Sequence, residues 1–165
     1  RILKFSKDQL PKKNQNSTKS IMGGLLVQDT DDSQEKTEDW ISVTNKNANN
    51  QANLDLNFAW KICKHVKSNA IVIAKGQKTI GIGAGQMNRV GAAKIALKAA
   101  EGSCSEAVLA SDGFFPFADT VELANDYGIK AIIQPGGSLR DQDSIDMCNS
   151  KGISMIFTQK RHFLH

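Results

Sequence analysis

The sequence predicts an α/β protein whose mostly parallel sheet is covered by helices on both faces. Apolar runs of about five residues alternate with helix-like segments of 10 to 15 residues along the second half of the chain. Gly, Pro, Asn and Asp residues separate these runs and mark the turns. Strands joined by helices form crossovers that pack helices onto both faces of a sheet. Ligands in such sheets usually bind at the carboxyl ends of the strands.

The first part of the chain is expected to consist mostly of loops. Residues 10–20 and 29–39 are polar and rich in turn formers, so both are predicted as loops. Between them, residues 21–29 (IMGGLLVQD) resemble a buried strand that is entered through Gly23 and Gly24.

A helix is predicted over residues 54–68, where Leu54, Phe58, Ile62 and Val66 recur at about helical spacing. Residues 47–55 precede it, and an Asn or Asp there is expected to cap the helix.

The remaining elements follow in a regular order. Strands are predicted at 70–74, 79–84, 107–111, 130–134 and 153–157, with a turn at 75–78 and helices at 89–102, 118–128 and 139–152. Three of the intervening loops carry unusual chemistry: GAGQMNR, SDGFFPFAD and QPGGS.

The composition is that of an ordinary globular domain. The chain has 165 residues, 40% hydrophobic and 23% charged, so one domain is expected. No apolar run approaches the roughly 20 residues that a membrane helix needs. Three cysteines without a C-x-x-C pair suggest reduced thiols in the cytosol, in core or surface positions. The net charge of +4, without interleaved aromatic residues, is weak support for nucleic-acid binding. The opening Arg1 suggests a piece of a longer polypeptide.

The glycine-rich GIGAGQ motif (residues 81–86) is not a dinucleotide-binding fingerprint. Gln86 replaces the third glycine, and no acidic residue follows at the required distance. The glycines indicate a close backbone approach, either to neighbouring structure or to a ligand.

The SDGFFPFAD motif (residues 111–119) places three phenylalanines around Pro116 in a loop that follows a strand. Exposed aromatic residues are costly unless something covers them. The motif therefore indicates either a plug of the core or a surface for a flat aromatic cosubstrate.

Two further motifs have two interpretations each. QPGGS is either an anion cradle of backbone N–H groups or a simple turn. The terminal KRHFLH is either a frayed basic tail or a segment that anchors Arg161 near a phosphate. Lys64 and His65 are interpreted as exposed residues on a helix, because neighbouring helical residues point in different directions.

Taken together, the motifs resemble a known family. Segments 23–29, 66–75, 79–90, 110–119, 133–141 and 157–165 are similar, in order, to the bifunctional purine-biosynthesis proteins that are AICAR formyltransferase and IMP cyclohydrolase. The resemblance runs from about Gly23 to His165. It implies the carboxyl-terminal part of the formyltransferase domain, with a segment at 1–52 and a cytidine-deaminase-like half at 53–165. That fold is a three-layer α/β/α arrangement with a mixed, mostly parallel sheet.

The resemblance implies formyl transfer from 10-formyltetrahydrofolate to the 5-amino group of AICAR. It also implies a homodimeric, cytoplasmic full-length protein, a structural potassium ion near the terminal segment and no zinc. The cyclohydrolase domain lies outside this chain, and nothing here matches the family's catalytic Lys-His pair. The chain alone is therefore expected to be inactive.

Site residues are carried over from the family motif by motif. The catalytic residue is Asn69; the substrate-binding residues are Asn69, Arg89, Phe114 and Arg161; the cosubstrate-binding residues are Val90, Phe114, Pro116 and Asp119. The alternative from another class is a non-catalytic nucleotide- or folate-binding module. RNA binding through the basic amino-terminal segment ranks third.

Overall fold

The computed structural model describes residues 4, 6, 16–31 and 36–164. The chain divides into two units, residues 1–34 and residues 35–165. The loop predictions for residues 10–15 and 32–35 lie outside the described residues.

The first unit contains an antiparallel hairpin of β1 (Asn16–Ile21) and β2 (Gly24–Asp29). Gly23 adopts a φ of +79°, which suits the tight turn between the strands. All twelve strand residues are exposed, so the prediction of a buried strand at 21–29 is wrong. The predicted loop is also wrong for residues 16–20, which lie in β1. A two-stranded sheet has no second layer of its own to cover its faces.

The second unit is built on a six-stranded sheet with the order β3-β8-β7-β6-β4-β5. Its strands are β3 (Ile41–Ser42), β4 (Ile71–Lys75), β5 (Lys78–Gly83), β6 (Val108–Ser111), β7 (Ala131–Gln134) and β8 (Ser154–Phe157). The pairs β6–β7 and β7–β8 are parallel, and the pairs β3–β8, β4–β5 and β4–β6 are antiparallel. The sheet is mixed as expected, but neighbouring pairs are not mostly parallel. The cause is the tight turn at Gly76 and Gln77, both with positive φ, which folds β4 and β5 into a hairpin.

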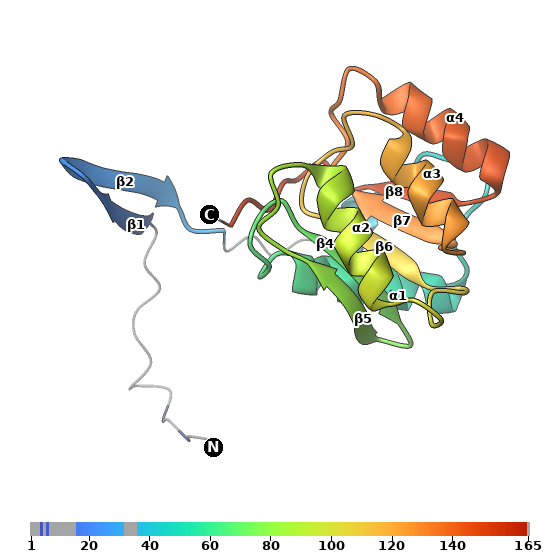
Figure 1. The fold of residues 1–165 in the computed structure, drawn as a ribbon, viewed down its shortest axis with the longest axis horizontal. Helices are drawn as coiled ribbons and strands as arrows, with labels where there is room; N and C mark the ends of the chain where they lie inside the picture. The colour runs from blue at the N-terminus through green and yellow to red at the C-terminus, as the bar shows by residue number, and fades with distance from the viewer. Residues whose placement is uncertain (1–3, 5, 7–15, 32–35, 165) are drawn as a thin grey trace. The chain divides into compact units, whose positions relative to one another are not determined.

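Helices cover both faces of this sheet. They are α1 (Asn50–Cys63), α2 (Arg89–Ala99), α3 (Asp119–Asp126) and α4 (Asp141–Lys151). A 3₁₀ turn, η2 (Thr37–Asp39), precedes β3 and has no buried residue. Figure 1 shows α2, α3 and α4 along one face and α1 on the other. Along β4, Ile71 and Ile73 join the core beneath α2, whereas Val72 and Ala74 join the core beneath α1. The predicted three-layer α/β/α arrangement is confirmed. No helix among the described residues is long and apolar enough to cross a membrane.

Helix α1 is capped by an asparagine as predicted, because the Asn49 side chain accepts a hydrogen bond from the Ala52 N–H at 2.8 Å. The helix begins at Asn50, earlier than the predicted start at Leu54. The expected stripe is not the buried one, however, since Leu54 is 51% exposed. The buried face carries Leu56, Ala59, Trp60 and Cys63, a second set at helical spacing.

The helix also ends earlier than predicted. Cys63 is its last residue and Lys64 is the C-cap, so Lys64 and His65 follow the helix rather than lying on its face.

The glycines of β5 let α2 approach the sheet closely. A Cβ atom on Gly83 would lie 2.7 Å from the carbonyl carbon of Ala92, and one on Gly81 would lie 3.0 Å from that of Ala96. The close approach inferred from GIGAGQ is therefore made, at these two positions, to the backbone of α2. It places the first residue of α2, Arg89, at one end of the sheet.

Candidate functional site

The candidate site lies at the end of the sheet where β6, β7 and β8 finish and β4 begins. Because β4 runs antiparallel to β6, Asn69 at the start of β4 meets Ser111 and Asp112 at the end of β6. Arg89 enters the same region from the start of α2. Three sequence segments that are distant along the chain thus meet at one edge, as expected for an α/β sheet.

The centre of this region is a buried ion pair between Arg89 and Asp112. The two side chains are 9% and 0% exposed. Asp112 also accepts hydrogen bonds from the Ser68 hydroxyl and, at 3.1 Å, from the Ala70 N–H. Arg89 donates a further bond to Ser111 Oγ at 3.2 Å. A buried carboxylate with several charge-assisted partners holds its surroundings in one arrangement.

Asn69 is tied directly to this pair. Nη2 of Arg89 donates to Oδ1 of Asn69 at 2.7 Å, and Nδ2 of Asn69 donates to the Gln86 carbonyl at 2.8 Å. An amide side chain has two N–H donors and two acceptor lone pairs, so these contacts use one of each. The amide, which is half-buried, has a second N–H and a second lone pair beyond these two contacts.

The three phenylalanines of the SDGFFPFAD motif have different environments. Phe115 is fully buried, so the interpretation as a core plug holds for this residue. Phe114 is half-buried, and the guanidinium of Arg161 lies 4.8 Å from its ring centre. Phe117 is 50% exposed, with the guanidinium of Arg140 at 5.0 Å. Each of these two rings thus has a cation over its face.

The terminal segment is anchored rather than frayed over residues 158–164. The His162 N–H donates to the Asp112 carbonyl at 3.0 Å, and the Leu164 carbonyl accepts from the Ser68 N–H at 2.9 Å. The His162 ring is buried and lies 4.6 Å from the ring of Trp60. These contacts bring Arg161, itself exposed, to the site.

The QPGGS loop does not form a free cradle of N–H groups. The Gly136 N–H donates to the Gln134 side chain at 3.2 Å, and the Gly137 N–H donates to Asp141 at 2.7 Å. Both groups are therefore occupied, and the predicted anion cradle is wrong in that form. A Cβ on Gly137 would lie 3.6 Å from the Arg161 guanidinium, so the loop borders that side chain instead.

Besides Phe114, the predicted cosubstrate-binding residues lie on α2, in the loop before α3 and on α3. Val90 is half-buried in the first turn of α2, and Pro116 is exposed in the loop before α3. Asp119 is the exposed first residue of α3, where its carboxylate accepts from the Thr120 N–H at 2.7 Å. Their roles toward a folate stay predictions.

A thiol adjoins the ion pair but is poorly suited to reaction. Burial raises the pKa of Cys63 well above its ordinary value, and the negative charge of Asp112 raises it further. All three cysteines are free and buried, which decides between the core and surface positions that the sequence left open. Within residues 4, 6, 16–31 and 36–164, no group of three or more His, Cys, Asp or Glu residues is arranged to hold a metal ion.

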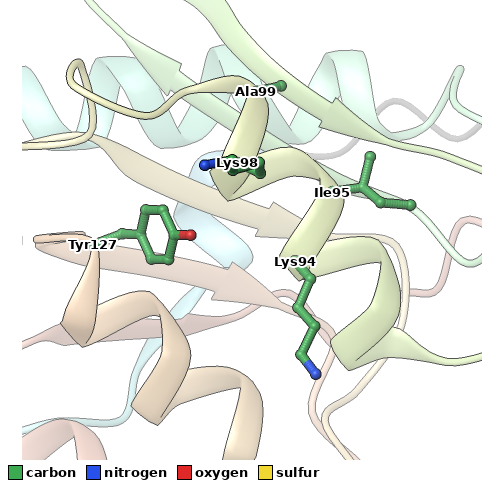
Figure 2. A pocket seen from close by; sticks show the side chains of 5 residues that line it. All are labelled: Lys94, Ile95, Lys98, Ala99 and Tyr127. Carbon is green, nitrogen blue, oxygen red and sulfur yellow. The ribbon is translucent and has the colours of Figure 1, made fainter.

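A cavity of about 630 Å³ lies elsewhere, over the outer surface of α2 (Figure 2). It is lined by Lys94, Ile95, Lys98, Ala99 and Tyr127. The hydrogen bond and charge of Glu101 raise the pKa of Lys98. Lys98 and Tyr127 lie at the carboxyl ends of α2 and α3, whereas Arg89 and Asp119 lie at the amino ends of the same helices. The cavity is therefore separate from the strand-end site.

Two buried residues of the site escaped the sequence analysis. Asp112 and Gln134 are both 0% exposed and both sit where an apolar strand ends. A polar residue directly after a buried strand was the available signal, because such a group needs internal partners.

The comparisons with known proteins show the family of the chain. A sequence model of the family described as AICARFT/IMPCHase bienzyme matches residues 1–99. The chain is 94% identical over its full length to the bifunctional purine biosynthesis protein PurH of Prochlorococcus marinus strain MIT 9301. It is 56% identical to the protein of that name in strain NATL1A, again over its full length. The chain spans 32% of the length of each of these relatives.

Proposed function

Because the chain belongs to the AICARFT/IMPCHase bienzyme family, we propose that it supplies part of the formyltransferase site of a bifunctional purine-biosynthesis enzyme. The reaction moves the formyl group of 10-formyltetrahydrofolate to the 5-amino group of AICAR. The direct hydrogen bond between Asn69 and Arg89, at 2.7 Å, carries the proposal. It joins two residues, assigned from two separate motifs of the same family resemblance, into one functional unit.

The chemistry needs positioning groups of this kind. The amine of AICAR is a weak nucleophile, so its attack on the formyl carbon requires orientation, removal of a proton and a donor for the developing oxyanion. Asn69 offers one further N–H and one further acceptor at a half-buried position. Arg89, fixed by Asp112, holds the Asn69 amide in a single orientation.

We assign the nucleotide phosphate to Arg161. Its guanidinium is exposed, lies over the Phe114 ring and borders Gly137. A guanidinium binds phosphate through paired hydrogen bonds. Phe114 would then line both ligands, with Val90, Pro116 and Asp119 on the folate side.

The proposal includes further features implied by the resemblance: the cytidine-deaminase-like fold, the homodimer and the potassium ion. For the ion, the terminal segment carries oxygen atoms such as Thr158 Oγ1, which in this structure donates a hydrogen bond to the Lys160 carbonyl at 3.1 Å. Oxygen is the ligand that hard cations prefer. We assign the ion no step in the reaction.

The decisive experiment measures formyl transfer in a full-length protein that contains this chain. Asn69→Ala should lose about 2 to 4 kcal/mol of transition-state stabilisation, which corresponds to roughly 30- to 1000-fold in rate. Asn53→Ala, at an exposed asparagine on α1, is the matched control and should leave the rate unchanged. The 165-residue chain alone should show negligible transfer.

Two results would overturn the proposal. Substantial turnover by the 165-residue chain alone would contradict the expectation that the reaction needs the family's Lys-His pair, which nothing in this chain matches. Binding of AICAR and a folate by the full-length protein without any transfer would favour the alternative, a non-catalytic binding module.

A further inference from the structure

Gln134 is a fully buried amide at the centre of the strand-end edge. It is the last residue of β7, which lies between β6 and β8, and its side chain is 0% exposed. A buried amide is costly unless its polar atoms have partners. Its partners therefore indicate what the residue does.

A single oxygen of Gln134 serves two loops. Oε1 accepts from the Phe115 N–H and from the Gly136 N–H, each at 3.2 Å. Nε2 faces the sulfur of Met155 on β8 at 3.5 Å, an arrangement that fixes which end of the amide points at the loops. The side chain thus fastens the loop after β6 to the loop after β7.

The backbone around Gln134 also attaches the terminal segment to these two loops. The joint is this set of three segments held together at Gln134. The Gln134 carbonyl accepts from the Thr158 N–H at 3.0 Å, and the Pro135 carbonyl accepts from the Gln159 N–H at 2.9 Å. Arg161 lies two positions after Gln159. Its guanidinium lies 4.8 Å from the ring centre of Phe114, the neighbour of Phe115. The distance between Phe114 and Arg161 therefore depends on segments that all meet at Gln134.

We propose that Gln134 is a positioning residue that sets the spacing between Phe114 and Arg161 in the ligand site. It acts through the two N–H groups that its Oε1 accepts from, because a fully buried side chain does not reach a ligand. The inference rests on the proposed function, in which Arg161 binds the phosphate of the nucleotide and Phe114 lines it.

The test uses the full-length protein with Gln134→Leu, Gln134→Asn and Gln134→Glu. Leucine removes the acceptor and leaves two buried N–H groups without a partner. Asparagine keeps an amide but is one methylene too short to reach both loops. Glutamate keeps an acceptor of the same length, and burial favours its neutral acid form, whose carbonyl oxygen should still accept from both N–H groups and restore the joint. Gln142→Leu, at an exposed glutamine on α4 that bonds Asp146 at 2.8 Å, is the matched control.

Hydrogen exchange gives a readout that does not depend on activity. Peptides covering residues 112–117 and 135–138 should exchange faster in the Leu and Asn variants than in the wild type, and at the wild-type rate in the Glu variant. Unchanged exchange in both loops of the Leu and Asn variants would overturn the joint itself. If the Leu variant does not fold, the Asn variant decides.

Steady-state kinetics give the functional readout. The Leu and Asn variants should raise the KM for AICAR by about tenfold or more, with a smaller change in kcat, since a misplaced Arg161 weakens binding of the phosphate. If the wild-type enzyme is active and the KM for AICAR is unchanged in the Leu and Asn variants, the positioning role is overturned. A wild-type protein without transfer activity would instead overturn the proposed function, and hydrogen exchange would still test the joint.

Discussion

Two buried aspartates, Asp55 and Asp112, lie at opposite ends of β4 and have different partners. Asp55, on α1, accepts from the Gly76 and Gln77 N–H groups at 2.9 and 2.7 Å, and from the Gln51 side chain at 3.0 Å. Asp112, after β6, faces the guanidinium of Arg89 and the hydroxyl of Ser68. The two side chains are almost equally buried, at 2% and 0% exposed.

The difference lies in what each carboxylate holds. Asp55 fixes the backbone of a tight turn, so its contribution is to the hairpin of β4 and β5. Asp112 fixes a charged side chain that in turn holds Asn69. Burial and hydrogen bonding alone therefore do not distinguish a structural carboxylate from one that organises a site; the partners do.

The largest effect is expected for Asp112→Leu. Removal of one partner leaves the Arg89 charge buried and uncompensated, which typically costs about 3 to 5 kcal/mol. Urea denaturation of the chain measures this loss in the free energy of unfolding. In the full-length protein, formyl transfer should fall at least as far as in Asn69→Ala, because the Asn69 amide loses its fixed partner.

A double variant tests that reason. Asp112→Leu combined with Arg89→Met removes both charges and should be more stable than Asp112→Leu alone. Equal instability of the single and double variants would show that the cost does not come from the unpaired guanidinium.

A smaller and purely structural effect is expected for Asp55→Ala. Two backbone N–H groups of the turn lose their acceptor, which costs about 1 to 3 kcal/mol in the free energy of unfolding. Formyl transfer by the full-length protein should stay at the wild-type level, because the turn lies at the far end of β4. A loss of activity in a well-folded Asp55 variant would break the distinction between the two aspartates.

The sequence predicted most of the second unit because local signals there agree with the fold. Each run of about five apolar residues from residue 70 onward became a strand, and Asn49 capped α1. The buried face of α1 was harder, since Leu54 and Leu56 begin two overlapping stripes and only the packing against β4 and β6 chooses between them. The prediction that residues 21–29 form a buried strand rested on their apolar content alone. Apolar content does not show whether another layer of structure covers the strand, and β2 is exposed.

The site was predicted only in part. Motifs located Asn69, Arg89, Phe114 and Arg161, and the structure joins them as two contacting pairs. The roles of Asp112 and Gln134 depend on partners that lie far away along the chain, such as Arg89 for Asp112 and Phe115 for Gln134. Spacing along the chain does not reveal such partners.

Cys148 extends the comparison of Asp55 and Asp112 to an ionisable group whose pKa is shifted by burial alone. Burial raises the pKa of this thiol, on α4, from its ordinary value of 9.0 to about 12. The unfolded chain releases the proton first as the pH rises, so this contribution to stability is complete below pH 9 and is lost between pH 9 and 12. The loss is about 1.4 kcal/mol per pH unit in that window.

The measurement is the free energy of unfolding of the wild type and of Cys148→Ala at pH 8, 9 and 10. The gap between the two proteins should shift by only about 0.4 kcal/mol from pH 8 to 9 and by about 1.0 kcal/mol from pH 9 to 10, because the alanine variant lacks the thiol. A gap that stays constant to pH 10 would mean that burial does not protect this thiol from ionisation.

The smallest effect is expected for the exposed ion pair of Arg140 and Asp143, which lies near the same strand-end loops as Arg89 and Asp112. Its N–O distance is 2.6 Å, but the two side chains are 56% and 46% exposed. Water screens such a pair, so Arg140→Ala should change the free energy of unfolding by less than about 1 kcal/mol. Arg140 also covers the Phe117 ring at 5.0 Å, and that contact is equally exposed to solvent. A loss comparable to that of Asp112→Leu would mean that proximity to the site, rather than burial, sets the strength of an ion pair in this protein.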